Sequence, residues 1–289
     1  MTHPVRIAHR GASGDGLAPE NTLAAFEKAI QIGVDAVEVD VHATSDNHLV
    51  VIHDSTLDRT TDHSGVVREL AFEQIREADA GSWCGAEFTG ERVPELEEVL
   101  DLARHRALLL IEIKADYLAE KVLQTVVEMD AASQVIIQSF SQQTIKRVRL
   151  LEPTIPTSLL MGKLPTTPSR VRARKMVRDV LAVGANSVGL WHNVVTPALL
   201  EEMRRRALSV WTWTVNEEVA MRDLVQMGIQ GIITNYPDRL NQVLQDLEDQ
   251  GLVEPPLGRR RRLKGGRWSR RRLIKKAQKK RGGGNSVAS

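Results

Sequence analysis

Residues 36–41 read Ala-Val-Glu-Val-Asp-Val, and this short run is the most informative stretch of the chain. Successive side chains of a β-strand point to opposite faces, so Glu38 and Asp40 share one face and the valines share the other. Buried charges are costly unless a cation or a hydrogen-bond network neutralises them. Ile111-Glu112-Ile113-Lys114 repeats the pattern. Two such strands are typical of a barrel with charged groups in its lumen and helices outside.

Short β-branched runs alternate with helix-like segments through residues 1–254, and Ser141, Thr196 and Asn216 are expected to cap three of the helices. Repeated strand–helix units predict a parallel sheet, and about eight of them in about 250 residues match a TIM (β/α)8 barrel. A doubly wound open sheet is the alternative. The expected strands are Val5–Ala8, Ala36–Val41, Leu49–Ile52, Leu108–Ile113, Val135–Ser139, Thr157–Met161, Ser187–Leu190, Val210–Val215 and Gly231–Thr234. The expected helices are Thr22–Ile32, Pro94–Arg104, Ala119–Met129, Gln142–Leu151, Arg170–Val183, Pro197–Arg206, Glu217–Met227 and Arg239–Leu247.

Three regions are expected: an α/β barrel domain in residues 1–254, a small rim insertion within it at 60–91, and a basic, disordered tail at 255–289. The net charge of +2 hides an uneven distribution, because Arg259–Arg281 contains 14 Lys and Arg residues and no acid. The rest of the chain has 25 of the 39 basic residues and all 37 acidic residues, for a net charge of −12. This asymmetry indicates an appended segment with its own partner or solvation role.

Composition places the chain among globular proteins, with 42% hydrophobic and 26% charged residues. No apolar stretch reaches the length of a signal peptide's core or of a membrane span. The single cysteine, Cys84, excludes an intramolecular disulfide and fits a reducing compartment. We therefore expect a cytoplasmic protein.

The carboxylates Glu38, Asp40 and Glu112 would meet at the strand ends of the expected barrel. Three hard oxygen ligands suit one divalent cation, Mg²⁺ or Ca²⁺, and the scarcity of Cys and His nearby argues against structural zinc. The alternative is a buried ion pair between Lys114 and these carboxylates without a metal.

Two histidines follow expected strands and should lie at the C-terminal rim, where barrel enzymes build their sites. His9-Arg10 ends the first strand, and His53 follows Leu49–Ile52. A pair of histidines can act as general base and general acid on a phosphodiester. Arg10 and Lys114 would neutralise phosphate oxygens.

Eight short motifs, in their order and spacing, resemble the motif series of the bacterial, soluble glycerophosphodiester phosphodiesterases. The resemblance covers roughly Ile7 to Leu247. The motifs are His9-Arg10-Gly11-Ala12, Pro19-Glu20-Asn21-Thr22, Glu38-Val39-Asp40-Val41, His53-Asp54, Ile111-Glu112-Ile113-Lys114, Gln138-Ser139-Phe140, Val210-Trp211-Thr212-Trp213-Thr214-Val215-Asn216 and Gly231-Ile232-Ile233-Thr234-Asn235-Tyr236-Pro237.

The resemblance implies a phosphoric diester hydrolase of glycerol and lipid metabolism. The substrate's own glycerol hydroxyl would attack phosphorus, and water would open the cyclic phosphate to glycerol 3-phosphate and an alcohol. Trp213 would form an apolar wall for glycerol, although a plain core tryptophan is its alternative. The implied roles are acid–base catalysis for His9 and His53, metal binding for Glu38, Asp40 and Glu112, and support for Glu20, Asn21 and Gln138.

Two other functions stay open at this point. The same site could act on lysophospholipids as a lysophospholipase D, which the basic tail mildly favours by offering a contact with membranes. A catalytically silent binding protein is less favoured, because the set of charged residues and histidines is complete. The tail could bind RNA, DNA or an anionic membrane, or could be solvated without a partner. The sequence leaves the oligomeric state open.

Overall fold

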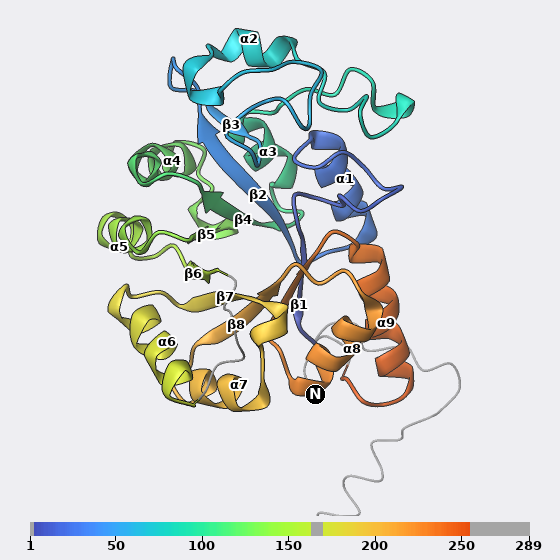
Figure 1. Cartoon of the computed structure of the whole chain (residues 1–289), viewed down its shortest axis with the longest axis vertical. Coiled ribbons are helices and arrows are strands. Elements are labelled where there is room, and N and C mark those ends of the chain that lie inside the picture. The colour runs from blue at the N-terminus through green and yellow to red at the C-terminus, as the bar shows by residue number, and fades with distance from the viewer. Residues whose placement is uncertain (1–2, 163–169, 255–289) are drawn as a thin grey trace, which may run out of the picture. The chain divides into compact units, whose positions relative to one another are not determined.

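Eight parallel strands close into a barrel in the computed structural model, which describes residues 3–162 and 170–254 (Figure 1). β1 pairs with both β2 and β9, and this double pairing closes the ring. The TIM barrel that the sequence predicts is therefore confirmed, and the open sheet is excluded. The barrel strands are β1 (Val5–Ala8), β2 (Ala36–Ala43), β4 (Leu108–Ile113), β5 (Val135–Ser139), β6 (Thr157–Met161), β7 (Ser187–Trp191), β8 (Ser209–Trp213) and β9 (Gly231–Thr234).

Helices surround the strands on the outside of the barrel (Figure 1). Ser141 and Thr196 cap their helices as expected. Ser141 accepts hydrogen bonds from two backbone N–H groups of the first turn, and Thr196 accepts one, from Leu199 N. The expectation for Asn216 is wrong, because its side chain accepts instead from Asn235 N, at the end of β9. The helices are α1 (Leu23–Ile32), α2 (Phe72–Glu77), α3 (Leu96–Ala103), α4 (Ala119–Glu128), α5 (Gln142–Leu151), α6 (Arg170–Ala182), α7 (Pro197–Arg204), α8 (Glu218–Met227) and α9 (Pro237–Asp249).

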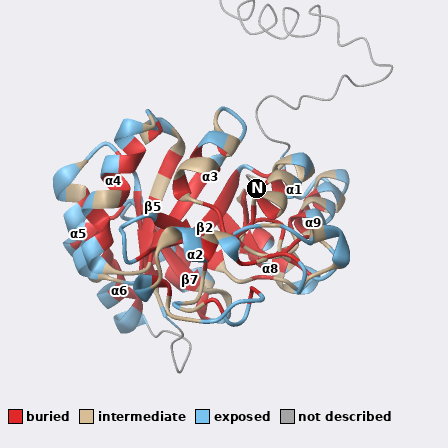
Figure 2. Ribbon diagram, turned by 90° about the horizontal axis from the view of Figure 1, so that it is seen from above, coloured by how far each residue is buried: buried red, intermediate tan, exposed pale blue. Residues whose placement is uncertain are grey.

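The side chains of β2 alternate between two environments, as its sequence predicts. Val37, Val39 and Val41 are buried in the outer core between the sheet and the helices, whereas Ala36 packs inside the barrel. Figure 2 shows the buried residues concentrated along the strands and the inner sides of the helices. Glu38 and Asp40 share the inner face with Ala36. The inner core beneath the site consists of Ile7, Ala36, Leu110, Trp211 and Ile233.

The segment around residue 50 differs from the expected arrangement. β3 (Leu49–Val51) is not a barrel strand, since it runs antiparallel to the end of β2 and pairs with its residues 41–43. The chain reverses between them through a tight turn in which Thr44 N donates to His48 O and Asn47 has a φ of 66°. Periodicity marks a strand but not its direction, which is why the sequence did not show this hairpin.

Residues 60–91 form the insertion expected at the rim, and they contain α2 and two short 3-10 helices, Val67–Glu69 and Ala86–Phe88. The insertion packs on β3 through a small apolar cluster of its own. This cluster consists of Val50, Ile52, Leu57, Val67, Ile75, Ala78, Ala80 and Val93. The insertion is therefore an ordered substructure with its own core.

The chain divides into two units, residues 1–254 and residues 255–289. The second unit, on which the expectation of a disordered basic tail falls, lies outside the described residues. Within residues 3–162 and 170–254, no helix has the length and apolar character that a membrane span requires.

Gly231 is the position where the inner core tolerates no side chain. A Cβ placed there would lie 2.6 Å from the Trp211 ring. Gly231→Ala should therefore lower the free energy of unfolding by about 1–3 kcal/mol, because a close-packed interior resists added volume. Urea denaturation measures the change. Gly162→Ala is the control, since nothing lies within 4 Å of its added Cβ; equal stability of the two variants would contradict the prediction.

Candidate active site

Three carboxylates meet inside the C-terminal mouth of the barrel. Asp40 and Glu112 are register partners on the adjacent strands β2 and β4, and Glu38 lies two residues before Asp40 on the same face. Their exposed fractions are 1% for Glu38, 1% for Asp40 and 8% for Glu112. One oxygen from each lies within 4.8 Å of the others. The structure thus brings together the three carboxylates that the alternating strands predict.

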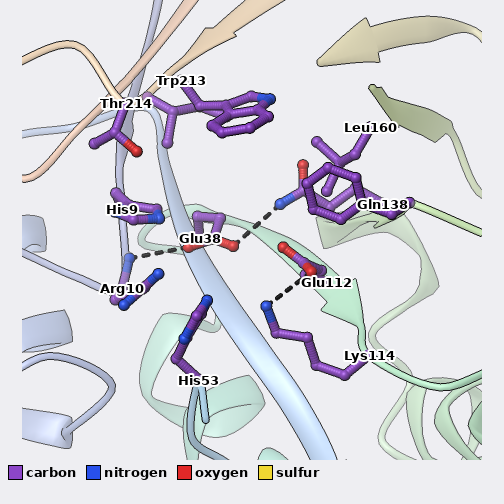
Figure 3. A pocket seen from close by; sticks show the side chains of 12 residues that line it. His9, Arg10, Glu38, His53, Glu112, Lys114, Gln138, Leu160, Trp213 and Thr214 are labelled. Carbon is purple, nitrogen blue, oxygen red and sulfur yellow. Dashed lines mark hydrogen bonds and ion pairs between the residues drawn. The ribbon is translucent and has the colours of Figure 1, made fainter. Parts of the chain in front are cut away.

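Two basic side chains face this acidic cluster. Lys114 Nζ lies 2.7 Å from Asp40 Oδ1 and 2.8 Å from Glu112 Oε1. Arg10 Nε lies 3.3 Å from Asp40 Oδ2, and the Arg10 backbone N–H donates to Glu38 Oε2 at 3.0 Å. Figure 3 shows Arg10 and Lys114 approaching the carboxylates from different segments. The ion pair that the sequence left as an alternative is therefore present in the structure.

Two amide side chains orient the carboxylates. Asn21 Nδ2 donates to Asp40 Oδ2 at 2.9 Å, and Gln138 Nε2 donates to Glu38 Oε1 at 3.1 Å. Asn21 and Arg10 both have a φ of 57°, a left-handed conformation that costs energy in residues other than glycine. A backbone hydrogen bond from Asn21 N to Arg10 O, 3.0 Å long, joins these two strained residues. Such strain is typical of functional sites, where surrounding contacts stabilise it.

The charges in the cluster do not balance. Burial raises the pKa of Glu38 well above its ordinary value, and the nearby Asp40 and Glu112 raise it further. Burial and Asp40 likewise raise the pKa of Glu112. Burial also acts to raise the pKa of Asp40, but the charges of Lys114 and Arg10 outweigh it and lower that pKa. Two cations therefore compensate three carboxylates incompletely.

A divalent cation fits this cluster both in charge and in size. Mg²⁺ and Ca²⁺ bind oxygen at about 2.0–2.6 Å, so two oxygens on one ion lie up to about 5 Å apart. The 4.8 Å limit among the oxygens of Glu38, Asp40 and Glu112 meets this condition. Three carboxylates are also the hard oxygen ligands that these ions prefer.

The two histidines each have a partner that orients the ring. His9 follows β1, and its Nδ1 lies 2.7 Å from Asn235 Oδ1. His53 Nδ1 lies 2.7 Å from Asp54 Oδ1. Both partner atoms are oxygens that only accept, so Nδ1 is the donor in each pair and Nε2 is left for the pocket. His53 reaches the mouth because β3 returns along β2, and not because it ends a barrel strand.

Burial makes both rings poor bases in the free protein. Burial, with a smaller contribution from the charge of Arg10, lowers the pKa of His9 to about 4. Burial also lowers the pKa of His53. Both rings are therefore neutral at pH 7, and each Nε2 has a lone pair that can accept a proton.

Glu20 lies outside the acidic cluster. Its carboxylate accepts from Arg10 NH1 at 2.8 Å and from both terminal nitrogens of Arg59. Sequence reasoning assigned no role to Arg59, Asp54 or Asn235. Asp54 and Asn235 stood inside quoted motifs, and their position beside a strand end was the available signal. Arg59 gave no signal, because its partners come from two separate loops.

Aromatic and aliphatic side chains line the other side of the pocket (Figure 3). Trp213 and Phe140 meet edge to face with ring centroids 5.8 Å apart, and Leu160 lies beside them. Gly189 leaves room for this wall, since a Cβ there would lie 2.5 Å from Leu160 and 3.6 Å from Trp213. Trp213 is therefore part of the pocket and not only of the core. The cavity has a volume of about 130 Å³.

The fold and the site define an enzyme of the TIM-barrel class, with a pocket lined by carboxylates, basic side chains and two histidines. The model of the glycerophosphoryl diester phosphodiesterase family matches residues 9–239. This chain belongs to that family, whose reaction is the hydrolysis of glycerophosphodiesters. The match includes every residue named above in the pocket.

Individual bacterial relatives agree with this assignment. The chain is 38% identical over 236 residues to the YhdW protein of Bacillus subtilis, covering 80% of this chain and 94% of the relative. It is 35% identical over 240 residues to the glycerophosphodiester phosphodiesterase of Caldanaerobacter subterraneus, covering 81% and 95%. An Oleispira antarctica phosphodiesterase, solved with the product sn-glycerol-3-phosphate, has a TM-score of 0.73 at 27% identity, covering 84% of this chain and 97% of that one.

The charge imbalance predicts opposite effects for two isosteric substitutions in metal-free protein at pH 7. Glu38→Gln should raise the free energy of unfolding by about 1 kcal/mol, because it removes a carboxylate whose ionisation burial disfavours. Asp40→Asn should lower it by about 3–5 kcal/mol, because Lys114 and Arg10 lose their buried counter-charge. Urea denaturation in EDTA measures both. An equal loss in the two variants would show that Glu38 and Asp40 are equivalent and would contradict the prediction.

Proposed function

We propose that the chain hydrolyses glycerophosphodiesters to glycerol 3-phosphate and an alcohol, with His9 and His53 as the catalytic acid–base pair. The observation that carries the proposal is the meeting, in one pocket, of a carboxylate cluster, two basic side chains and two oriented histidines. A silent binding protein would not need this complete set.

One divalent cation, Mg²⁺ or Ca²⁺, would be held by Glu38, Asp40 and Glu112. When bound, it supplies positive charge to the phosphate oxygens and to the attacking hydroxyl. Asn21 and Gln138 orient two of these carboxylates through the hydrogen bonds given above. Their role is therefore to keep the ligand oxygens in place.

Arg10 and Lys114 would neutralise the phosphate. Both already contact carboxylates of the cluster, so their charged groups lie beside the position that a phosphodiester would take. Glu20 positions Arg10 through its 2.8 Å hydrogen bond to NH1. The planar guanidinium of Arg10 can donate two parallel hydrogen bonds to phosphate, whereas Lys114 acts as a point charge.

The two histidines divide the proton transfers. In the first step, one Nε2 takes the proton of the substrate's glycerol hydroxyl as its oxygen bonds to phosphorus. The negative charge of the bound phosphodiester favours protonation of the other histidine, and this imidazolium gives its Nε2 proton to the alcohol oxygen as that P–O bond breaks, which leaves a cyclic glycerol phosphate. Water then attacks phosphorus with the roles reversed, and the opened ring oxygen takes the proton. The Nδ1 contacts to Asn235 and Asp54 support this assignment, because they aim each Nε2 into the pocket.

The apolar wall of Trp213, Phe140 and Leu160 would receive the carbon side of glycerol. The sn-glycerol-3-phosphate bound by the Oleispira relative supports this product for the present chain. The small cavity suits a glycerol phosphate unit, and the alcohol would extend toward solvent.

A lysophospholipid is the second substrate candidate. Phe140 lines the catalytic pocket, is 49% exposed, and also borders a neighbouring groove. Apolar side chains dominate this groove, namely Leu159, Leu160, Met161 and Met176. An acyl chain leaving the pocket past Phe140 would meet this surface.

The first test is release of glycerol 3-phosphate from glycerophosphocholine and, in parallel, from a lysophospholipid. EDTA should abolish turnover, and Mg²⁺ or Ca²⁺ should restore it. Preference for the lipid would favour the second candidate, and no turnover of either substrate would contradict both.

His9→Ala and His53→Ala should each lower kcat by about 10²–10⁴-fold, the usual contribution of acid–base catalysis. His63→Ala is the matched control. His63 also makes a 2.7 Å contact with a neighbouring carboxylate, that of Asp62, but it does not line the pocket. A similar loss in all three variants would contradict the assignment.

The basic tail should contribute nothing to the chemistry. Deleting residues 259–289 should leave kcat and KM for glycerophosphocholine within about twofold, since every residue assigned to the reaction lies between residues 9 and 235. We propose that the tail binds a polyanion, either RNA, DNA or an anionic membrane, through its 14 basic residues. We also propose a cytoplasmic location, since one cysteine forms no internal disulfide. A large loss of kcat or a large rise in KM for glycerophosphocholine on deletion would show that the tail does contribute to the chemistry.

A further inference from the structure

Arg59 joins two loops of the catalytic mouth. Its Nε donates to Asp54 Oδ2 at 2.6 Å, while NH1 and NH2 donate to the two oxygens of Glu20 at 2.9 Å and 2.7 Å. One planar guanidinium thus holds a carboxylate from the loop after β1 and another from the segment after β3. Bidentate pairs of this kind impose geometry as well as attraction.

Each of these carboxylates passes the contact on to a pocket residue. The second contact of Glu20 is the hydrogen bond from Arg10 NH1 at 2.8 Å. The other oxygen of Asp54, Oδ1, lies 2.7 Å from His53 Nδ1. The hydrogen bond from Arg59 outweighs the opposing effect of burial and lowers the pKa of Asp54 to about 2, so this carboxylate is ionised at neutral pH. A continuous chain of contacts therefore runs from Arg10 to His53 through Arg59.

The backbone around Arg59 is well supported. Leu57 is buried in the apolar cluster of the insertion, and its N–H donates to Gly65 O at 3.0 Å. Thr61, two residues after Arg59, donates from both its N–H and its hydroxyl to Leu57 O. The guanidinium is thus presented by a closed turn at the start of the insertion.

We propose that Arg59 is a positioning residue for the reaction, and that the rim insertion serves to hold it against Glu20 and Asp54. Through Asp54 it keeps the His53 ring oriented, and through Glu20 it keeps Arg10 at the phosphate position. The proposal rests on the function proposed above, because it takes His53 and Arg10 as members of the site.

A purely structural role for Arg59 makes a different prediction. The Arg59 side chain is 46% exposed, and salt bridges at such positions contribute little to folding stability. Removing it should therefore change catalysis far more than the thermal midpoint. If Arg59 acted only as a structural salt bridge, Arg59→Ala would lower the activity and the thermal midpoint together.

The test compares Arg59→Ala with Arg76→Ala. Arg76 lies in the insertion that follows Arg59 and makes a bidentate pair with Glu98 at 2.8 and 3.0 Å, but it does not line the pocket. Arg59→Ala should lower kcat by about tenfold or more and raise KM, while Arg76→Ala stays within about twofold. Asp54→Asn should lower mainly kcat, and Glu20→Gln should raise mainly KM. The effects differ because Asp54 contacts His53, whereas Glu20 contacts Arg10.

Added guanidinium chloride at millimolar concentration should restore part of the lost activity of Arg59→Ala. It should leave the activity of Arg76→Ala unchanged. Arg59→Lys should be less active than wild type, because a lysine ammonium group cannot reproduce the planar, forked donor geometry of the guanidinium. Activity of Arg59→Ala within about twofold of wild type, or a loss that guanidinium does not reverse and that parallels a fall in Tm, would overturn the proposal.

A readout independent of turnover separates this proposal from the function on which it rests. In ¹⁵N NMR of the histidine rings, Arg59→Ala should shift the His53 signals toward the other tautomer and leave those of His105 unchanged. His105 lies in the connection before β4, at the opposite end of the barrel. Unchanged His53 signals would overturn the positioning role whether or not the protein hydrolyses a glycerophosphodiester. Changed signals in a protein inactive on both substrates would support positioning and contradict the proposed function.

Discussion

The electrostatic constraint at the mouth of the barrel is the interaction on which the rest of the site depends. Three carboxylates are buried on adjacent strands, and burial alone would force protons onto them. Lys114, Arg10 and the hydrogen-bond donors beside the carboxylates stabilise part of this negative charge. The charge of a divalent cation fits the part that they leave uncompensated. The pocket is therefore an arrangement of buried charges that neighbouring donors and cations must stabilise.

The loops around the mouth are held together by side-chain contacts that cross long distances in the sequence. His9 is oriented by Asn235, which follows the last strand, and Asn235 in turn donates its backbone N–H to Asn216. Arg10 and Asn21 adopt strained left-handed backbones, and their direct hydrogen bond and contacts with the cluster compensate for this strain. The site is thus organised before substrate arrives, which is what electrostatic catalysis requires.

The residues that form the core of the barrel and those that form the candidate site lie at different levels along the barrel axis. Beneath the site, Trp211 and its apolar neighbours fill the lumen, and the outer core packs the helices against the strands. Above it, β2 continues past the barrel and returns as β3, which carries His53 to the mouth and supports the insertion. The long strand β2 therefore carries two of the carboxylates. Through its pairing with β3, it also supports His53 and the insertion at the rim.

The sequence alone favoured the barrel over an open sheet and determined the positions of most of its elements and the charged inner face of β2 and β4, because alternation and spacing are local properties of a chain. The closure of the ring was decided by the pairing of β1 with both β2 and β9. It also predicted that Glu38, Asp40, Glu112 and His9 would meet, since strands that run parallel end at one rim. His53 joins them as predicted, but through the hairpin of β2 and β3 and not as the end of a parallel strand. Only the tertiary structure decided the direction of β3, the use of Asn216 as a link to Asn235, and the bridge made by Arg59. Each of these depends on which loops lie side by side, and a residue whose partners are distant in the sequence has no local pattern by which to be recognised.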